Sequence, residues 1–190
     1  MAVDRIRTRF LVVGSGVAGL HAAWRAAEED GGPVMVLTKR SLFDSATAYA
    51  QGGIAAALGA GDSAKLHRQD TLAAGAALCD ARAVDVLVAE GPDRVRDLQT
   101  AGADFDVGPT GKLRLGKEAA HSRHRIVHAH GDQTGAEVVR TLIDRVEASP
   151  NIEVLEKTRV LDLIVHGGVC AGVRATVSGR PVEIIADATV

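Results

Sequence analysis

The chain has 190 residues, a length that suits one domain, or one domain and part of another. Hydrophobic residues make up 46% and aromatic residues only 3%, so alanine, valine and leucine must form the core, as they often do in sheets covered by helices. Lysine and arginine total 22 against 24 acidic residues, and the formal charge of −2 argues against a nucleic-acid or anionic-membrane binder, which would need clustered positive charge.

The cellular compartment is indicated by the cysteines and by the apolar runs. Cys79 and Cys170 lie far apart without CxxC or zinc spacing, which favours free thiols in a reducing compartment. Residues 10–24 follow three arginines and resemble a signal peptide, but glycines and a histidine break the run. No apolar run approaches the roughly 20 residues of a membrane helix. We therefore expect a cytoplasmic protein without a membrane segment.

The first elements form a β-α-β pattern. Residues 9–13 are an apolar run that ends at a glycine, which is typical of a buried parallel strand. Residues 17–29 have a helical pattern, stopped by Asp30-Gly-Gly-Pro33, and residues 34–37 predict a second buried strand. We expect the crossover between the two strands to be right-handed.

The middle of the chain is predicted to be irregular and helical. We expect an irregular segment at 38–53, a helix starting at Asp62-Ser63, a helix capped by Asp80 through Glu90, a separate helix opened by Pro92 and reaching Ala101, and a loop or short hairpin at 105–125.

The last third predicts one helix followed by strands. Residues 134–148 are amphipathic. Strands are expected at 152–155, 159–165, 169–177 and 182–185, and residues 186–190 begin another apolar run. The predicted fold class is α/β: a Rossmann-like domain with a parallel sheet, helices and an antiparallel β-meander over residues 159–185.

The strongest single motif is the glycine loop Gly14-Ser-Gly-Val-Ala-Gly19, which matches GxGxxG between a strand and a helix. In such a loop the first glycine permits the tight turn, the second lets the backbone approach a pyrophosphate, and the third lets helix and strand pack closely. Amide groups at the helix start then point at the phosphates. The motif and its context predict a dinucleotide site.

The end of the second strand leaves the dinucleotide open. Simple Rossmann units place a carboxylate there for the ribose, whereas this strand ends Leu37-Thr38-Lys39-Arg40. Lys39 and Arg40 would suit the 2′-phosphate of NADP. Alternatively the ligand is FAD, with Thr38 touching the ribose and Lys39 near the adenosine side.

A second segment of small residues follows, Ser45-Ala-Thr-Ala-Tyr-Ala-Gln-Gly-Gly53. Its glycines and short side chains allow the backbone to approach a flat ligand, and Thr47 and Gln51 could hydrogen-bond to ring heteroatoms. The alternative is a glycine-rich connector without a ligand.

Together, the glycine loop and this AQGG-type segment resemble the succinate dehydrogenase, fumarate reductase and L-aspartate oxidase flavoprotein family. Within it, Tyr49-Ala-Gln-Gly-Gly-Ile-Ala55 is most similar to the aspartate oxidase branch. The similarity continues through His67, Asp70-Thr71, Ala74-Gly75-Ala76, Cys79-Asp80, Glu118, His121-Ser122, residues 125–129, residues 131–135, Asn151-Ile152 and residues 160–164. One departure is Ala119-Ala120, where the family has a glycine pair.

The resemblance implies FAD as the cofactor and assigns residues to it. The diphosphate and adenosine side would contact Gly14, Ser15, Gly16, Val17, Ala18, Gly19, Thr38 and Lys39. The flavin side would contact Ala46, Thr47, Ala48, Tyr49, Ala50, Gln51, Gly52 and Gly53, and Arg159 and Val160 would lie beside the adenine. Many membrane-complex members bond the flavin covalently through a histidine, and Ala46 occupies that position here. Because alanine has no nucleophilic atom, FAD should be held non-covalently.

Seven charged or imidazole side chains crowd a short segment: Glu118, His121, Arg123, His124, Arg125, His128 and His130. A metal site is disfavoured because no ordered ligand spacing such as HExxH is present, so we expect no metal. A solvated polar loop is one alternative. We favour a substrate-facing loop, in which cations hold a dicarboxylate and Glu118 meets the α-ammonium of an amino acid. In the resembled aspartate oxidases the matching glutamate faces the substrate, so Glu118 is the candidate catalytic residue. We assign no individual role to His121, His124, His128 or His130.

The activity that the resemblance implies is FAD-dependent oxidation of L-aspartate to iminoaspartate, with oxygen or fumarate as acceptor, as the first step of NAD biosynthesis. Quinolinate synthase is then a candidate partner. The alternatives are a soluble fumarate reductase or succinate dehydrogenase flavoprotein, and an FAD-binding module without catalysis. Residues 1–190 should form the amino-terminal FAD-binding domain of a longer enzyme. The capping and helical domains would lie outside this chain, which should be inactive by itself.

Overall fold

The computed structural model describes residues 3–190. The chain divides into two compact units, one made of Met1–Ala48 and Val139–Val190 and the other of Tyr49–Val138. Among the described residues, no helix is both long enough and apolar enough to cross a membrane.

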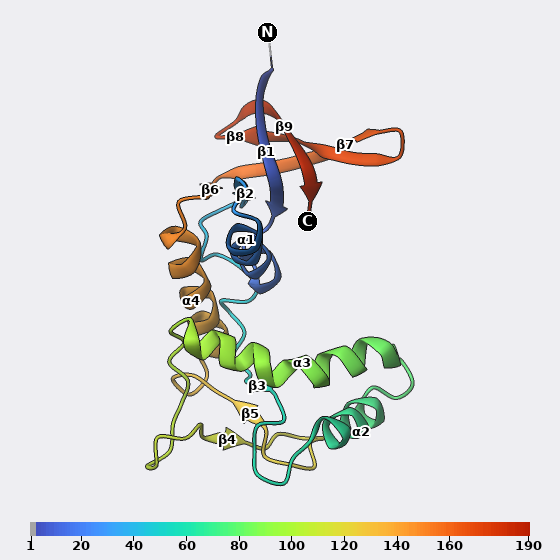
Figure 1. The fold of residues 1–190 in the computed structure, drawn as a ribbon, viewed down its shortest axis with the longest axis vertical. Coiled ribbons are helices and arrows are strands. Elements are labelled where there is room, and N and C mark those ends of the chain that lie inside the picture. Colours follow the sequence, from blue (N-terminus) through green and yellow to red (C-terminus); the bar gives the residue numbers. More distant parts are fainter. Residues whose placement is uncertain (1–2) are drawn as a thin grey trace. The chain divides into compact units, whose positions relative to one another are not determined.

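The first unit is built on a six-stranded sheet with the strand order β6-β2-β1-β9-β8-β7 (Figure 1). Its strands are β1 (Asp4–Val13), β2 (Val34–Leu37), β6 (Ile152–Leu155), β7 (Thr158–His166), β8 (Val169–Val177) and β9 (Arg180–Thr189). Helix α1 (Val17–Asp30) belongs to this unit, as does helix α4 (Thr134–Ala148) from Val139 onward. Strands β6, β2, β1 and β9 pair in parallel, whereas β9, β8 and β7 pair antiparallel. The predicted α/β class, with a parallel sheet and a meander, is confirmed.

Strand β9 joins the meander to the parallel strands, a connection that the sequence patterns did not predict. It pairs with β1 from Asp4 opposite Val182 to Leu11 opposite Thr189. This pairing also explains why both strands are longer than predicted. The first half of β1 alternates exposed arginines with partly buried Ile6 and Thr8, which is the pattern of a strand with one buried face.

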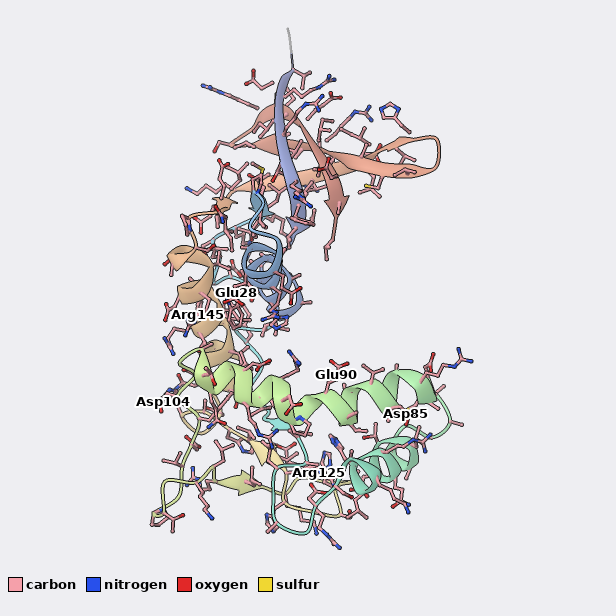
Figure 2. The ribbon with its side chains drawn as sticks, in the orientation of Figure 1. Glu28, Asp85, Glu90, Asp104, Arg125 and Arg145 are labelled. Carbon is pink, nitrogen blue, oxygen red and sulfur yellow. The ribbon has the colours of Figure 1, made fainter. Side chains whose placement is uncertain are left out.

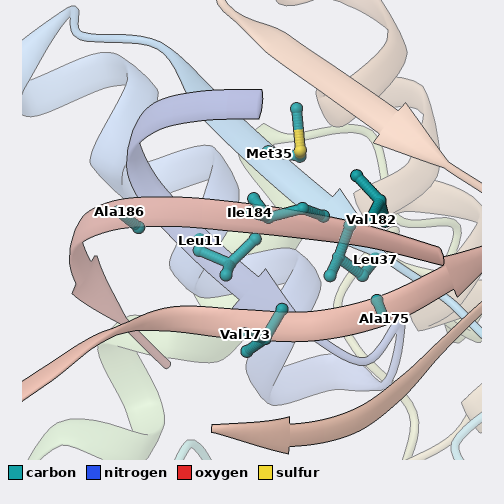
Figure 3. Packing of buried hydrophobic residues seen from close by; sticks show 8 residues of the cluster. All are labelled: Leu11, Met35, Leu37, Val173, Ala175, Val182, Ile184 and Ala186. Carbon is teal, nitrogen blue, oxygen red and sulfur yellow. The ribbon is translucent and has the colours of Figure 1, made fainter. Parts of the chain in front are cut away.

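The core of the first unit draws on both parts of the sheet. Leu11, Met35 and Leu37 of the parallel strands form one buried cluster with residues of the meander (Figure 3). The meander residues of that cluster are Val173, Ala175, Val182, Ile184 and Ala186. Because the two parts share this cluster, separating them would expose its apolar area to water, at a cost of roughly 25 cal/mol per Å². We therefore expect the meander and the parallel strands to be stable only together.

The second unit contains helices α2 (Ala64–Ala74) and α3 (Ala81–Thr100) and a small antiparallel sheet. The sheet has the order β3-β5-β4, with β3 (Ile54–Ala55), β5 (Ile126–Val127) and β4 (Leu115–Gly116). Both helices begin where the sequence predicts. The Ser63 hydroxyl accepts a hydrogen bond from the Leu66 amide at 3.3 Å, and the Asp80 carboxylate accepts from the Arg82 amide at 2.8 Å.

The prediction of two helices on either side of Pro92 is wrong, because α3 is continuous and carries Pro92 inside it (Figure 1). A proline in a helix removes one backbone hydrogen bond and crowds the preceding turn. Here Val84, Val88 and Val95 are buried on one face, before and after the proline. Packing of this continuous apolar face holds the two halves in one helix.

Candidate FAD and substrate site

Two glycines of the loop between β1 and α1 are required by the protein itself. Gly14 has φ +117°, which L side chains rarely adopt, and its amide donates to the Leu37 carbonyl at 2.9 Å. A Cβ at Gly19 would lie 2.1 Å from the Gly14 carbonyl oxygen, so a side chain there would collide with the backbone. These two positions therefore give the tight turn and the close helix-strand packing.

Gly16 is different, since the protein leaves room for a side chain there. It has φ −74°, and a Cβ would meet only the Thr47 hydroxyl within 4 Å, at an ordinary 3.5 Å. It also occupies the N-cap of α1 without a side-chain cap, where the first amides of a helix lack partners within the helix. The open space and the helix start fit a pyrophosphate, whose approach a side chain at this position would obstruct.

The side chains of Thr38 and Thr47 form hydrogen bonds with the glycine loop and the start of α1. The Val17 amide donates to the Thr47 hydroxyl at 3.1 Å, which brings the segment around Thr47 against the start of α1. Beneath the loop, the hydroxyls of Ser15 and Thr38 lie 3.0 Å apart, and both residues are buried. The Thr38 hydroxyl thus supports the loop, and its contact with a ribose stays a prediction.

The predicted adenosine-side residues come together at the end of β2. The Thr158 amide donates to the Thr38 carbonyl at 2.9 Å, so the first residues of β7 run beside the end of β2. Lys39 and Arg159 are exposed there, and Val160 is half-buried. All lie where parallel strands end, the edge at which open α/β sheets bind ligands.

In the second unit, residues Tyr49, Ala50, Gln51 and Gly52 are exposed and Gly53 packs against β5. A Cβ at Gly53 would lie 2.3 Å from Cγ2 of Ile126, whereas a Cβ at Gly52 would meet nothing within 4 Å. The Gln51 amide donates to Asp132 at 3.3 Å. The backbone at Gly52 is thus open to a flat ligand, and Gly53 anchors the segment to the small sheet.

Arg125, labelled in Figure 2, lies in the second unit. It is fully buried there and is therefore not available to a substrate. Its Nε and one terminal nitrogen donate to the Asp62 carboxylate, both at 2.8 Å, and the other terminal nitrogen donates to Asp70 at 2.7 Å. The Ser122 amide and hydroxyl also donate to Asp70, each at 2.8 Å. Arg125 therefore ties α2 and the loop before it to the segment that carries Glu118.

The carboxylates of this cluster have lowered pKa values. Backbone and hydroxyl hydrogen bonds from Ser122, together with Arg125, lower the pKa of Asp70 to about 2, against the cost of burial. Burial opposes ionisation of Asp62, but hydrogen bonds from Arg125 and from the Ser63 amide outweigh it and lower its pKa. The nearby His67 is buried, and burial and the Arg125 charge lower its pKa, so its imidazole is neutral. Sequence reasoning missed Asp62 and Asp70 as partners of Arg125. The signal that could have indicated a buried arginine is the position of Arg125 directly before the apolar pair Ile126-Val127.

Glu118 and His128 form a separate pair. Nε2 of His128 lies 3.3 Å from a carboxylate oxygen of Glu118, whose side chain is 53% exposed. His128 also lines a surface hollow of about 400 Å³ with Asp106, Arg114, Leu115, Gly116, Lys117, His124 and Gly131. Sequence reasoning did not single out Arg114 and Lys117, which lie outside the histidine-rich run. Of the other predicted residues, His130 faces Glu137 at 3.7 Å, and Arg123 donates to the Gly61 carbonyl.

Two structural findings bear on the remaining predictions. Within residues 3–190, no three His, Cys, Asp or Glu side chains are grouped so that they could hold a metal ion. Ala120, which stands where the resembled family has glycine, has φ +67°. The loop after Glu118 therefore keeps a left-handed conformation that glycine adopts more easily.

Comparison with known proteins supports the assignment of the dinucleotide. The family model described as "FAD binding domain" matches residues 9–190, nearly the whole chain. The chain belongs to this FAD-binding family. FAD, rather than NADP, is thus its dinucleotide.

Similar proteins include named L-aspartate oxidases. The chain is 51% identical to L-aspartate oxidase of Streptomyces coelicolor over 171 residues, which cover 90% of this chain and 29% of that protein. It is 46% identical to the chloroplastic L-aspartate oxidase of Arabidopsis thaliana, covering 86% of this chain and 25% of the relative. The chain thus spans less than a third of the length of these relatives.

Solved structures with the same fold come from the wider flavoprotein family. The Mycobacterium smegmatis Sdh1 complex has a TM-score of 0.92 with 32% identity over 98% of this chain and 34% of that chain. The Escherichia coli quinol fumarate reductase FrdA has a TM-score of 0.94 with 29% identity over 98% of this chain and 32% of that chain. The resemblance to this family is confirmed.

Proposed function

We propose that the complete protein oxidises L-aspartate to iminoaspartate, with oxygen or fumarate as the electron acceptor. The observation that carries the proposal is the exposed Glu118 carboxylate, in a chain that is 42–51% identical to several proteins named L-aspartate oxidase. This chain would be the amino-terminal FAD-binding domain. The capping and helical domains would lie outside it, and residues 1–190 alone should not turn over aspartate.

The chain's own residues would hold FAD without a covalent bond. The glycine loop, made of Gly14, Ser15, Gly16, Val17, Ala18 and Gly19, would enclose the diphosphate, which would lie against the start of α1. Lys39, Arg159 and Val160 would flank the adenosine end, and Ala46–Gly53 would lie along the flavin. Bound FAD supplies the redox chemistry, accepting a hydride equivalent from the substrate, and the protein supplies position and charge.

Glu118 would make the site discriminate between an amino acid and a dicarboxylate without an ammonium group. Its carboxylate would accept charge-assisted hydrogen bonds from the α-ammonium of aspartate, a group that succinate and fumarate lack. A site built to bind a polar substrate group discriminates strongly against an analogue without it, because the site's own polar group then stays unpaired. Glu118 is exposed to solvent, whereas Arg125 is buried, and this exposure supports the role of Glu118.

The reaction would be the first step of de novo NAD biosynthesis, carried out in the cytoplasm. Its product, an imine of oxaloacetate, hydrolyses readily in water, so an enzyme that consumes it should act at once. Quinolinate synthase is the proposed consumer.

The test is turnover by the full-length protein with bound FAD. Aerobic peroxide release should be seen with L-aspartate and not with D-aspartate or succinate, and fumarate should replace oxygen under anaerobic conditions. Clear preference for succinate would assign the protein to the succinate dehydrogenase and fumarate reductase branch. FAD binding without turnover of either substrate would reduce it to a binding module.

A further inference from the structure

The imidazole of His128 lies in a slot between two glycines of the second unit. A Cβ at Gly53 would lie 2.9 Å from Nε2 of His128, and a Cβ at Gly116 would lie 2.9 Å from its Cε1. Gly53 ends the segment that would follow the flavin, and Gly116 ends β4, two residues before Glu118. The ring therefore fills the space that two side chains would otherwise occupy.

The backbone that carries His128 is held by hydrogen bonds. His128 directly follows β5, which pairs with both β3 and β4. Its carbonyl accepts a hydrogen bond from the Asp106 amide at 2.8 Å. Only the Nε2 side of the ring reaches the Glu118 carboxylate, at 3.3 Å. The exposed fraction of the side chain is 24% for His128 and 53% for Glu118, so the histidine is the more enclosed partner.

We propose that His128 is a positioning residue, which orients the Glu118 carboxylate toward the substrate's ammonium group by a hydrogen bond from Nε2. This inference rests on the proposed function, since it assigns the ammonium to Glu118. An exposed glutamate without a partner samples many rotamers, and ordering it on binding costs free energy. A histidine wedged between glycines removes that cost before the substrate arrives. The inference also explains why Gly116 lacks a side chain, whereas a Cβ at Gly53 would meet Cγ2 of Ile126 and the Val127 carbonyl oxygen before it met the ring.

The test measures binding of two matched ligands to the full-length FAD-loaded protein by the change in flavin absorbance. 2-Methyl-L-aspartate carries the ammonium but no α-hydrogen, so it cannot be oxidised, and 2-methylsuccinate is the same dicarboxylate without the ammonium. His128→Leu should weaken binding of 2-methyl-L-aspartate about tenfold, within the range expected for loss of a charge-assisted hydrogen bond. Binding of 2-methylsuccinate should change less than about twofold.

Two controls separate positioning from packing. His128→Gln fills similar space and places an amide nitrogen where Nε2 lies, so it should restore most of the lost affinity. His166→Leu removes an exposed histidine of β7, outside the second unit, and should leave binding of both ligands unchanged. If His128→Leu loses FAD, His128→Asn replaces it, because asparagine is too short to reach Glu118.

The outcomes distinguish the two proposals. Equal weakening of both ligands by His128→Leu, or failure of His128→Gln to restore binding, would show that the ring only fills space and would overturn the inference alone. If the wild-type protein binds both ligands equally, Glu118 does not sense the ammonium. This inference would then fail, whereas the proposed oxidation of L-aspartate is decided separately by the turnover test.

Discussion

Replacement of Arg125 by methionine should destabilise the second unit by about 3–5 kcal/mol, the usual cost of breaking a buried ion pair by removing one partner. The structure indicates a loss of stability at the upper end of this range. Arg125 is completely buried, it donates three hydrogen bonds to two carboxylates, and the side chain of Asp62 is only 1% exposed. Methionine would leave Asp62 and Asp70 without their cation.

Hydrogen exchange measured by mass spectrometry tests this loss of stability, because it reports the protection of amides in individual segments. Amides of β5 and of the turn after Glu118 should lose protection by about 100-fold or more, since 1.4 kcal/mol corresponds to tenfold. Arg125→Lys should recover part of the loss, because lysine keeps the charge without the bidentate geometry.

Arg123→Met is the matched control. Arg123 is exposed and donates to the Gly61 and Ser122 carbonyls, so its loss should cost less than about 1 kcal/mol. Equal loss of protection in Arg123→Met and Arg125→Met would refute the view that the Arg125 cluster holds this segment together.

Three further predictions concern the cofactor and pH. Gly16→Val should abolish co-elution of flavin absorbance with a folded full-length protein, whereas Gly19→Val should impair folding itself, because its Cβ would collide with the Gly14 carbonyl; flavin retention by Gly16→Val would contradict the loop assignment. Since the pKa values of Asp70, at about 2, and Asp62 lie below their unfolded values, their stabilisation is complete above about pH 4 and is lost as the pH falls toward 2. Acid unfolding followed by circular dichroism should show this step, and Asp70→Asn should weaken it; an unchanged acid transition would argue against the cluster. Acid precipitation should leave the yellow colour in the supernatant, because Ala46 offers no atom for a covalent flavin bond. Colour in the washed pellet would disprove non-covalent binding.

Features that depend on neighbouring residues were determined by the sequence alone. The glycine loop, the caps at Ser63 and Asp80 and the helix from Thr134 to Ala148 were all predictable. Each arises within one or two turns of chain, from backbone freedom, side-chain caps or apolar periodicity. The AQGG-type segment was informative for a similar reason, since small residues allow close backbone approach wherever the segment lies.

Contacts between distant residues were decided only by the tertiary structure. The pairing of β1 with β9 joins the two ends of the described chain, and no local pattern states which strand a half-buried strand will pair with. Pro92 signals a helix boundary locally, but burial of valines on both sides of it keeps α3 continuous. Arg125 reads as one more surface cation until folding brings Asp62 and Asp70 to it from 63 and 55 residues away. A buried charge is tolerated only with such partners, so whether an arginine binds a substrate or holds the fold depends on what surrounds it in space.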